Sequence, residues 1–248
     1  MKGYFKNMKT ITKVDFATYL GVILAFIVVS VCQAQGLVNR SLGGMLVPIC
    51  CYVCMSISLN LTVGILGELS LGHAGFMSVG AFSGIIAAMS LQSAVPNDLV
   101  RMIVALVVGA FFAAIVGFIV GIPVLRLRGD YLAIVTLGFG EIIRVVIQNL
   151  TITGGGRGLY GIDEYTTFPW VFWIAALSVA VMYSMIGTRQ GRAILSLREN
   201  EIAAEAVGVP STRYKVLAFT LSSFFAGVAG GLYAHYITVL DPATFDFN

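Results

Sequence analysis

Long runs of apolar residues, separated by short polar segments, follow one another along the whole chain. A helix needs about 20 mostly apolar residues to cross the hydrocarbon layer of a bilayer. The pattern therefore predicts about seven transmembrane helices. They are expected near residues 16–38, 42–66, 73–91, 101–125, 131–150, 168–187 and 215–240.

The composition points to the same class of protein. Hydrophobic residues account for 58% of the 248 positions and charged residues for only 11%, whereas a soluble domain carries about 25% charged residues. With so few charges the surface is expected to face membrane lipid, and the predicted fold class is an all-α polytopic membrane protein. The net charge is only +3 and the sequence has no long basic run, so nucleic acid is not an expected partner.

The positions of the basic residues predict the orientation, because lysine and arginine in short loops favour the cytoplasmic side. Four predicted spans separate the first basic group from the second, and two separate the second from the third. Both numbers are even, so one topology places every group in the cytoplasm, together with the N-terminus. The groups are Lys2, Lys6, Lys9 and Lys13; Arg126 and Arg128; and Arg189, Arg192, Arg198, Arg213 and Lys215.

This topology divides the chain into three parts. Residues 1–15 form a cytoplasmic N-terminal segment, residues 16–240 a transmembrane domain, and residues 241–248 an external segment that ends without a closing signal, as expected of a truncated piece. Lysines before an apolar run also suit a secretory signal. A second long span follows closely, however, so a retained first helix is favoured.

Residues 188–214 form the largest polar insert on the predicted cytoplasmic side. Ser196 and Glu199 fit a capping box at a helix start, and Gly208 suits the left-handed residue after a helix. The intervening residues predict a short amphipathic helix, which is either a connector between two spans or a docking element for a cytoplasmic partner. Its apolar face consists of Ile202, Ala203, Ala206 and Val207.

Polar residues within the predicted spans are candidates for a substrate path, because ionisable groups at membrane depth usually face a bundle interior or an aqueous cavity. Glu141 and Arg144 share a helix face and are expected to pair, either as a structural ion pair or along the path. His73, beside Ser70, is expected to start the third span with its imidazole bonded to the backbone; a place in the pore or gate is the alternative. Thr136 completes the candidate set.

Small residues carry further predictions. The pairs Gly80/Gly84, Gly117/Gly121 and Gly227/Gly231 have the spacing of closely crossing helices. In the predicted external loop, tight turns and exposed backbone donors would suit the docking of a binding protein, with a flexible linker as the alternative; the residues are Gly154, Gly155, Gly156 and Gly158. Cys51 and Cys54 have metal or redox spacing, but no second pair or histidine completes a site, so packing is favoured.

Four stretches of sequence carry a family resemblance. Glu205-Ala206-Val207-Gly208, set between two predicted spans, resembles the coupling-loop motif that seats in the ATPase subunit of ABC importers. Residues 64–76, 126–144 and 153–162 narrow the match. Together they resemble the permeases of branched-chain amino acid importers, specifically the LivM type, from about residue 59 to residue 241.

The resemblance implies an ABC importer permease architecture in a bacterial cytoplasmic (inner) membrane. A homologous permease would complete the pore, an external binding protein would deliver leucine, isoleucine or valine, and two cytoplasmic ATPase subunits would drive transport. Closure of those subunits would push segment 196–210 and switch access between the two sides. The implied coupling residues are Glu199, Glu205, Ala206 and Gly208.

The chain also departs from the family pattern in two places. Family members usually carry a Gly-Gly-Pro-Asn-Gly-like turn where this chain has residues 154–158, which leaves urea, short amides or other amino acids open as substrates. They also continue through a further glycine-rich helical region that this sequence lacks. This piece alone is therefore not expected to transport.

The sequence predicts no chemistry of its own. A Walker A loop needs a lysine directly after a glycine, and none of the five lysines has that neighbour. Zinc-type histidine motifs and cysteine–histidine pairs are also missing from the sequence, so no enzymatic activity, metal or cofactor is predicted. The main alternative is an ion-coupled secondary transporter or channel in which Glu141 carries a proton or ion.

Overall fold

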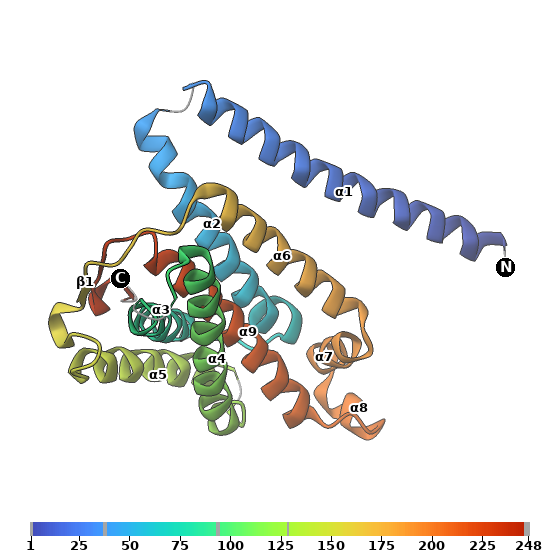
Figure 1. Cartoon of the computed structure of the whole chain (residues 1–248). Coiled ribbons are helices and arrows are strands. Elements are labelled where there is room, and N and C mark those ends of the chain that lie inside the picture. Colours follow the sequence, from blue (N-terminus) through green and yellow to red (C-terminus); the bar gives the residue numbers. More distant parts are fainter. Residues whose placement is uncertain (1, 37–38, 93–94, 128, 246–248) are drawn as a thin grey trace.

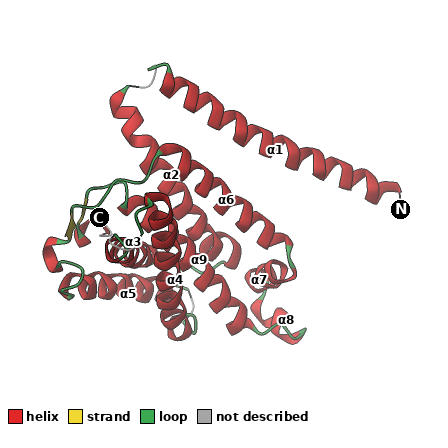
Figure 2. Cartoon of the chain, in the orientation of Figure 1, coloured by secondary structure: helices red, strands yellow, loops and turns green. Residues whose placement is uncertain are grey.

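The computed structural model describes residues 2–36, 39–92, 95–127 and 129–245, which are almost entirely helical (Figure 2). The α-helices are α1 (Lys2–Ala34), α2 (Arg40–Asn60), α3 (His73–Ser90), α4 (Asp98–Val124), α5 (Asp130–Asn149), α6 (Phe168–Gly187), α7 (Arg189–Glu199), α8 (Glu201–Ala206) and α9 (Ser211–Ala234). A π-helix, η1 (Leu61–Leu66), continues α2, and the short 3-10 helices η2 (Gly155–Arg157) and η3 (Pro242–Phe245) lie in the connections.

Five helices of the described chain are long and apolar enough to cross a membrane. They are α2 with η1, α3, α4, α6 and α9, and they coincide with five of the seven predicted spans. The apolar part of α1 is shorter, Thr18–Ala34. Helix α5 is not among the five and carries Glu141 and Arg144, so the described residues confirm five of the seven predicted spans, and the crossings by α1 and α5 stay predictions.

Helix α5 nevertheless connects the two ends of the bundle. Near its start, the Thr136 hydroxyl accepts a hydrogen bond from the Leu71 amide, just before α3 begins. Beyond its end, Leu159 and Tyr160 form β1, which pairs antiparallel with β2 (Val239–Leu240), the segment that follows α9. These two-residue strands are the exception to an all-α fold, and they join the loop after α5 to the far end of α9.

Helices α3 and α9 form the centre of the bundle. Of their apolar windows, 61% and 67% are buried, compared with 22% for α6. Figure 1 shows α3 nearly end-on, with α4, α5 and α9 around it. Because α6 leaves most of its apolar surface open, lipid or another subunit is expected to cover that surface.

Glycines allow helices α3, α4 and α9 to approach one another closely. A Cβ on Gly80 of α3 would overlap the backbone of Gly227 in α9, and one on Gly84 would lie 3.0 Å from the Ala105 carbonyl oxygen in α4. Gly117 and Gly231 likewise meet side chains of facing helices. The prediction that the spaced glycines mark close helix crossings is therefore confirmed.

Helix α1 diverges from the bundle along most of its length (Figure 1). It contacts α6 through aromatic side chains: the Phe26 ring centroid lies 5.1 Å from that of Phe172 and 5.3 Å from that of Trp173. Lys2–Ala34 is one helix, so it begins well before residue 16, where the first span is expected to start, and it includes most of the predicted N-terminal segment 1–15.

The segment between α6 and α9 folds as two helices. The predicted capping box at Ser196 is wrong, because Ser196 lies inside α7 and its hydroxyl donates to the Ala193 carbonyl. Thr188 caps α7 by accepting from the Gly191 amide at 3.2 Å. Asn200 caps α8. An asparagine is as good an N-cap as a serine. Because α7 ends at Glu199 and α8 begins at Glu201, Asn200 takes the capping position.

The last helix is shorter than the apolar run suggested. Helix α9 ends at Ala234, and the chain then turns into β2 rather than continuing as a helix to residue 240. The predicted external segment 241–248 contains η3, whose Phe245 is buried against the main core cluster; residues 246–248 lie outside the described residues.

Candidate functional site

Helix α8 presents an apolar surface that no other described part of the chain covers. Ile202 is 74% exposed and Val207 80% exposed, and Ala203 and Ala206 are exposed with them. Only Ala204 among the α8 residues is buried. An apolar patch left open on a polar segment is typical of a surface that binds a partner.

Both ends of α8 are fixed. The Asn200 side chain accepts a hydrogen bond from the Ala203 amide at 3.0 Å. Gly208 has φ +89°, the left-handed conformation in which glycine ends a helix without a Cβ clash, as the sequence predicts. The Glu205 carboxylate accepts a hydrogen bond from the hydroxyl of Ser211, the first residue of α9. Of the four predicted coupling residues, Glu205, Ala206 and Gly208 lie together here.

The buried side chain of Lys215 ties α8 to the interior. Its Nζ donates to Glu68 Oε1 at 2.6 Å and lies 2.9 Å from Glu201 Oε1. The lysine side chain is only 6% exposed. Because Glu68 lies between η1 and α3, Glu201 in α8 and Lys215 in α9, this charge cluster fixes three elements to one another.

A second tie joins α7 to the π-helix. Arg198 Nη1 donates to the Gly64 carbonyl at 2.7 Å, and its Nη2 donates to Glu199 Oε1 at 3.0 Å. The stem of Arg198 lies against Gly67 so closely that a Cβ there would come within 2.6 Å of its Cγ. The fourth predicted coupling residue, Glu199, thus orients the arginine that contacts η1.

Farther along α9, hydroxyl groups surround a buried imidazole. His73 Nε2 lies 2.7 Å from Ser222 Oγ and 3.3 Å from Thr62 Oγ1, and Nδ1 lies 3.2 Å from Ser70 Oγ. His73 begins α3 as predicted, but its ring bonds to side-chain hydroxyls and not to the backbone. Ser222 in turn donates to the Ser58 carbonyl at 2.6 Å.

The five candidates for the substrate path fall into two groups. Ser70, His73 and Thr136 come together at the start of α3, each no more than 3% exposed. Glu141 and Arg144 form the predicted ion pair, with Arg144 Nη2 2.8 Å from Glu141 Oε2. Their side chains are 41% and 24% exposed, so this pair lies on the open face of α5, away from the buried hydroxyls.

The predicted external loop, residues 154–158, has the conformation of a defined turn rather than of a flexible linker. Gly154 and Gly158 have φ +78° and +73°, and a Cβ on either would overlap a backbone carbonyl, that of Gly158 or of Leu240. Between them Gly155 and Gly156 open the 3-10 turn η2. Glycine is therefore required where the loop packs against β2.

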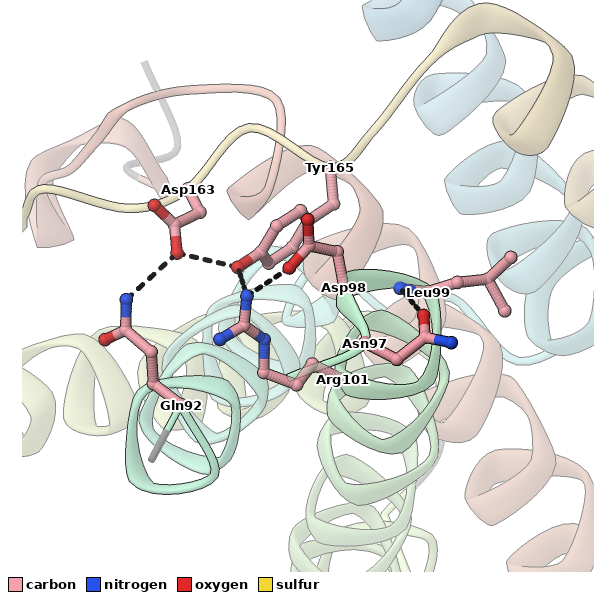
Figure 3. A network of polar contacts seen from close by, with 7 residues as sticks. All are labelled: Gln92, Asn97, Asp98, Leu99, Arg101, Asp163 and Tyr165. Carbon is pink, nitrogen blue, oxygen red and sulfur yellow. Dashed lines mark hydrogen bonds and ion pairs between the residues drawn. The ribbon is translucent and has the colours of Figure 1, made fainter. Parts of the chain in front are cut away.

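A polar network lies at the same end of the bundle as this loop (Figure 3). Arg101 near the start of α4 donates to Asp98 and to the Tyr165 hydroxyl, and its guanidinium carbon lies 5.2 Å from the Tyr165 ring centroid. Tyr165 donates to Asp163 Oδ2 at 2.6 Å. Burial raises the pKa of Tyr165 to about 12, and the hydrogen bond to the Asp163 carboxylate acts in the same direction. The Tyr165 hydroxyl therefore keeps its proton and remains a donor.

Sequence reasoning missed several residues that the fold gathers. The sequence does hold a signal for some of them: Ser211, Lys215 and Ser222 recur at helical spacing along one face of α9, and Ser58 and Thr62 are four apart. In the sequence, Lys215 is recognisable only as a member of the basic group that predicts the orientation. Which polar faces meet depends on how α2, α3 and α9 cross.

The long apolar helices around a close-packed, glycine-rich centre define an all-α polytopic membrane protein. A family model described as the branched-chain amino acid transport system / permease component matches residues 41–248. The chain belongs to this family of transport permeases, as its resemblance to the LivM type indicates.

The curated relatives agree with this assignment. The chain is 34% identical to the high-affinity branched-chain amino acid transport system permease protein LivM of Escherichia coli, over 79% of this chain and 53% of that protein. It is 27% identical to a probable branched-chain amino acid transport permease protein LivM of Methanocaldococcus jannaschii, over 75% of this chain and 64% of that protein.

A more distant relative is the ribose import permease protein RbsC of Escherichia coli, 29% identical over 68% of this chain. The chain spans about half the length of the E. coli relatives that it matches. No solved structure matches.

Proposed function

We propose that the chain forms part of the permease subunit of an ATP-driven importer for branched-chain amino acids in a bacterial cytoplasmic membrane. Its partners would be a homologous permease, two cytoplasmic ATPase subunits and an external binding protein. Membership of the permease family and the branched-chain amino acid relatives support this proposal. The observation that carries the mechanism is the open apolar surface of α8.

In this proposal α8 is the segment that receives force from the ATPase. Ile202 and Val207 provide apolar contact area that the chain itself leaves open, while the Asn200 cap and Gly208 keep the helix short and fixed. A rigid short helix transmits a push better than a flexible loop would. Residues 188–214 would then lie in the cytoplasm, and with them the N-terminus.

Motion of α8 would reach the interior through two contacts. Glu201 of α8 pairs with Lys215, which also holds Glu68. Glu68 precedes Ser70 and His73 by a few residues, so a displacement of α8 would pull on the segment that positions the buried imidazole. The hydroxyls of Ser222 and Thr62 donate their protons to backbone carbonyls, so both oxygens are acceptors for the Nε2–H of this ring. The ring would then exchange one acceptor for the other at little cost. The start of α3 would act as the gate.

The docking role is tested by recovery of the ATPase subunits with detergent-solubilised full-length protein. Val207→Asp, Ile202→Asp and Glu205→Ala should each weaken recovery, because they place charge on the docking face or release the α8–α9 contact. Ile152→Asp is the matched control, since Ile152 is 69% exposed but follows α5 at the opposite end of the bundle. Unchanged recovery of the ATPase subunits with all three α8 variants would contradict the docking role of α8.

The transport role is tested by uptake of radiolabelled leucine into proteoliposomes that contain the full complex and its binding protein. Uptake should require ATP and should not follow a proton or sodium gradient. Uptake that persists without the ATPase and follows an ion gradient would instead favour a secondary transporter. Urea or a short amide as competitor would reveal a different substrate class.

A further inference from the structure

A small pocket lies at the end of the bundle opposite α8. It has a cavity of about 20 Å³, enough for about one water-sized group. Its lining residues come from the end of α3, from the segment before α6 and from the residue after α9. They are Ile85, Ala88, Met89, Gln92, Gly161, Ile162, Asp163, Tyr165 and His235.

The pocket has an apolar floor and a polar rim. Ile85, Ala88 and Ile162 are at most 7% exposed, whereas Gln92 and Asp163 are exposed. A ligand entering from outside would thus meet a carboxylate first and an apolar surface behind it.

His235 supplies an unsatisfied acceptor to this pocket. The residue is 1% exposed, and its Nδ1 lies 2.8 Å from the Gly231 carbonyl oxygen. A carbonyl only accepts, so Nδ1 carries the proton, and in the neutral imidazole Nε2 is then a lone-pair acceptor. Among the described residues Nε2 has no hydrogen-bond partner. A buried polar atom left in this state calls for a ligand or water.

Asp163 adds a second acceptor, held in place by its neighbours. The hydrogen bonds that it receives in the described chain, from Tyr165 at 2.6 Å and from Gln92 at 3.3 Å, both end on Oδ2. Arg101 Nη2 donates to Asp98 and to Tyr165 rather than to Asp163 (Figure 3). Oδ1 of Asp163 is therefore left to accept a donor from outside the chain.

We propose that this pocket binds the α-ammonium group of the transported amino acid on its way from the binding protein into the permease. An ammonium group has three N–H donors and a positive charge, which matches a carboxylate oxygen and an imidazole nitrogen without a proton. The substrate's aliphatic side chain would lie along Met89 and the neighbouring apolar wall. The proposal rests on the function proposed above, and it deepens that function by naming the group that is recognised.

The site would reject other small molecules for the same reason. Urea and carboxylic acids without an amino group lack a cationic donor, so the two acceptors would remain unpaired when these molecules bind, which costs affinity. Asp163 would also repel an unaccompanied carboxylate. Selection at the external face would therefore favour amines before any contact with the interior of the pore.

The test measures binding of radiolabelled 3-methylbutylamine, which is leucine without its carboxylate, to the full permease complex in nanodiscs. The same complex is assayed with 4-methylpentanoate, which keeps the carboxylate and lacks the amine. The amine should bind and the acid should not. Asp163→Asn should weaken amine binding about tenfold, the loss of one charge-assisted hydrogen bond.

Glu164→Gln is the matched control, since Glu164 is an exposed carboxylate next to Asp163 that is not part of the pocket lining; it should leave amine affinity unchanged. His235→Gln, which keeps an acceptor oxygen, should retain more affinity than His235→Leu, and thermal unfolding of both variants shows whether they fold.

Two results would overturn the proposal. The first is a wild-type complex that imports leucine with ATP but binds no amine, which means that the pocket holds only water. The second is Asp163→Asn binding the amine as tightly as Glu164→Gln. A wild-type complex without ATP-driven leucine uptake contradicts the proposed function instead, so the two failures are distinguishable.

Discussion

Individual residues decide how closely the central helices of this membrane protein approach one another. Without a hydrophobic drive between helices in lipid, close backbone contact and interhelical hydrogen bonds must hold the bundle together. Gly80 and Gly227 provide the contact, and Ser58 and Ser222 exchange hydrogen bonds across α2 and α9 at 2.6 Å.

Substituting Gly80 should therefore destabilise the bundle. Gly80→Ala places a Cβ on the backbone of α9, and overpacking of this kind costs about 1–3 kcal/mol. Gly138→Ala in α5 is the control, because a Cβ there meets nothing within 4 Å. Thermal unfolding in detergent should show a lower midpoint for Gly80→Ala and an unchanged or higher one for Gly138→Ala; equal midpoints would contradict the packing argument.

The buried lysine gives a second prediction at this scale. Lys215→Met keeps the length of the side chain but leaves Glu68 and Glu201 without their shared cation, and removing one partner of a buried pair costs about 3 kcal/mol. Arg213→Gln, at an exposed position two residues earlier, should cost little. Adding Glu68→Gln to Lys215→Met should recover part of the lost unfolding temperature; no recovery would mean that the charges are not coupled.

At the scale of elements, the short helix α8 depends on its caps more than on its length. A six-residue helix is too short to be stable alone, because nucleation is costly and only a few hydrogen bonds follow. Its order comes from the Asn200 cap, the left-handed Gly208 and the contacts of Glu201 and Glu205 with α9.

Loss of the cap should loosen α8 without unfolding the bundle. Asn200→Ala removes the bond to the Ala203 amide, at a cost of about 1 kcal/mol, and hydrogen–deuterium exchange of residues 201–206 should become faster. Asn200→Ser keeps a capping oxygen and should exchange almost like the wild type. An identical exchange rate in Asn200→Ala and the wild type would show that tertiary contacts alone hold α8.

At the scale of the whole molecule, the side of the membrane on which each loop lies remains a prediction. The structure places the loop after α5 and the end of α9 together through β1 and β2, and it places α7 and α8 at the start of α9. If α5 crosses the bilayer, Arg126 and Gly156 lie on opposite sides.

Single cysteines test this topology in a chain whose Cys32, Cys50, Cys51 and Cys54 are replaced by alanine. A membrane-impermeant maleimide added to intact cells should label Gly156→Cys and Glu164→Cys. It should label Arg126→Cys and Ile202→Cys only after the membrane has been permeabilised. Labelling of positions 126 and 156 from the same side would mean that α5 does not cross.

The sequence by itself determined the class of the protein, the positions of most helices and the surface features of α8. These depend on composition, on the length of apolar runs and on local rules such as the left-handed glycine at residue 208, which act within a few residues. Its motifs also carried the resemblance to the permease family. Local signals misplaced helix ends, however, because Ser196 and Asn200 both suit a cap and only packing selects between them.

Tertiary structure alone decided which polar groups meet. Lys215 and Glu68 are far apart in sequence, as are His73 and Ser222, and nothing in their spacing pairs them. The pocket around His235 likewise joins residues from three separate parts of the chain. The way the helices cross sets these contacts. The spacing of glycines in the sequence indicates that helices cross closely, but it does not determine which helices cross or at what angle.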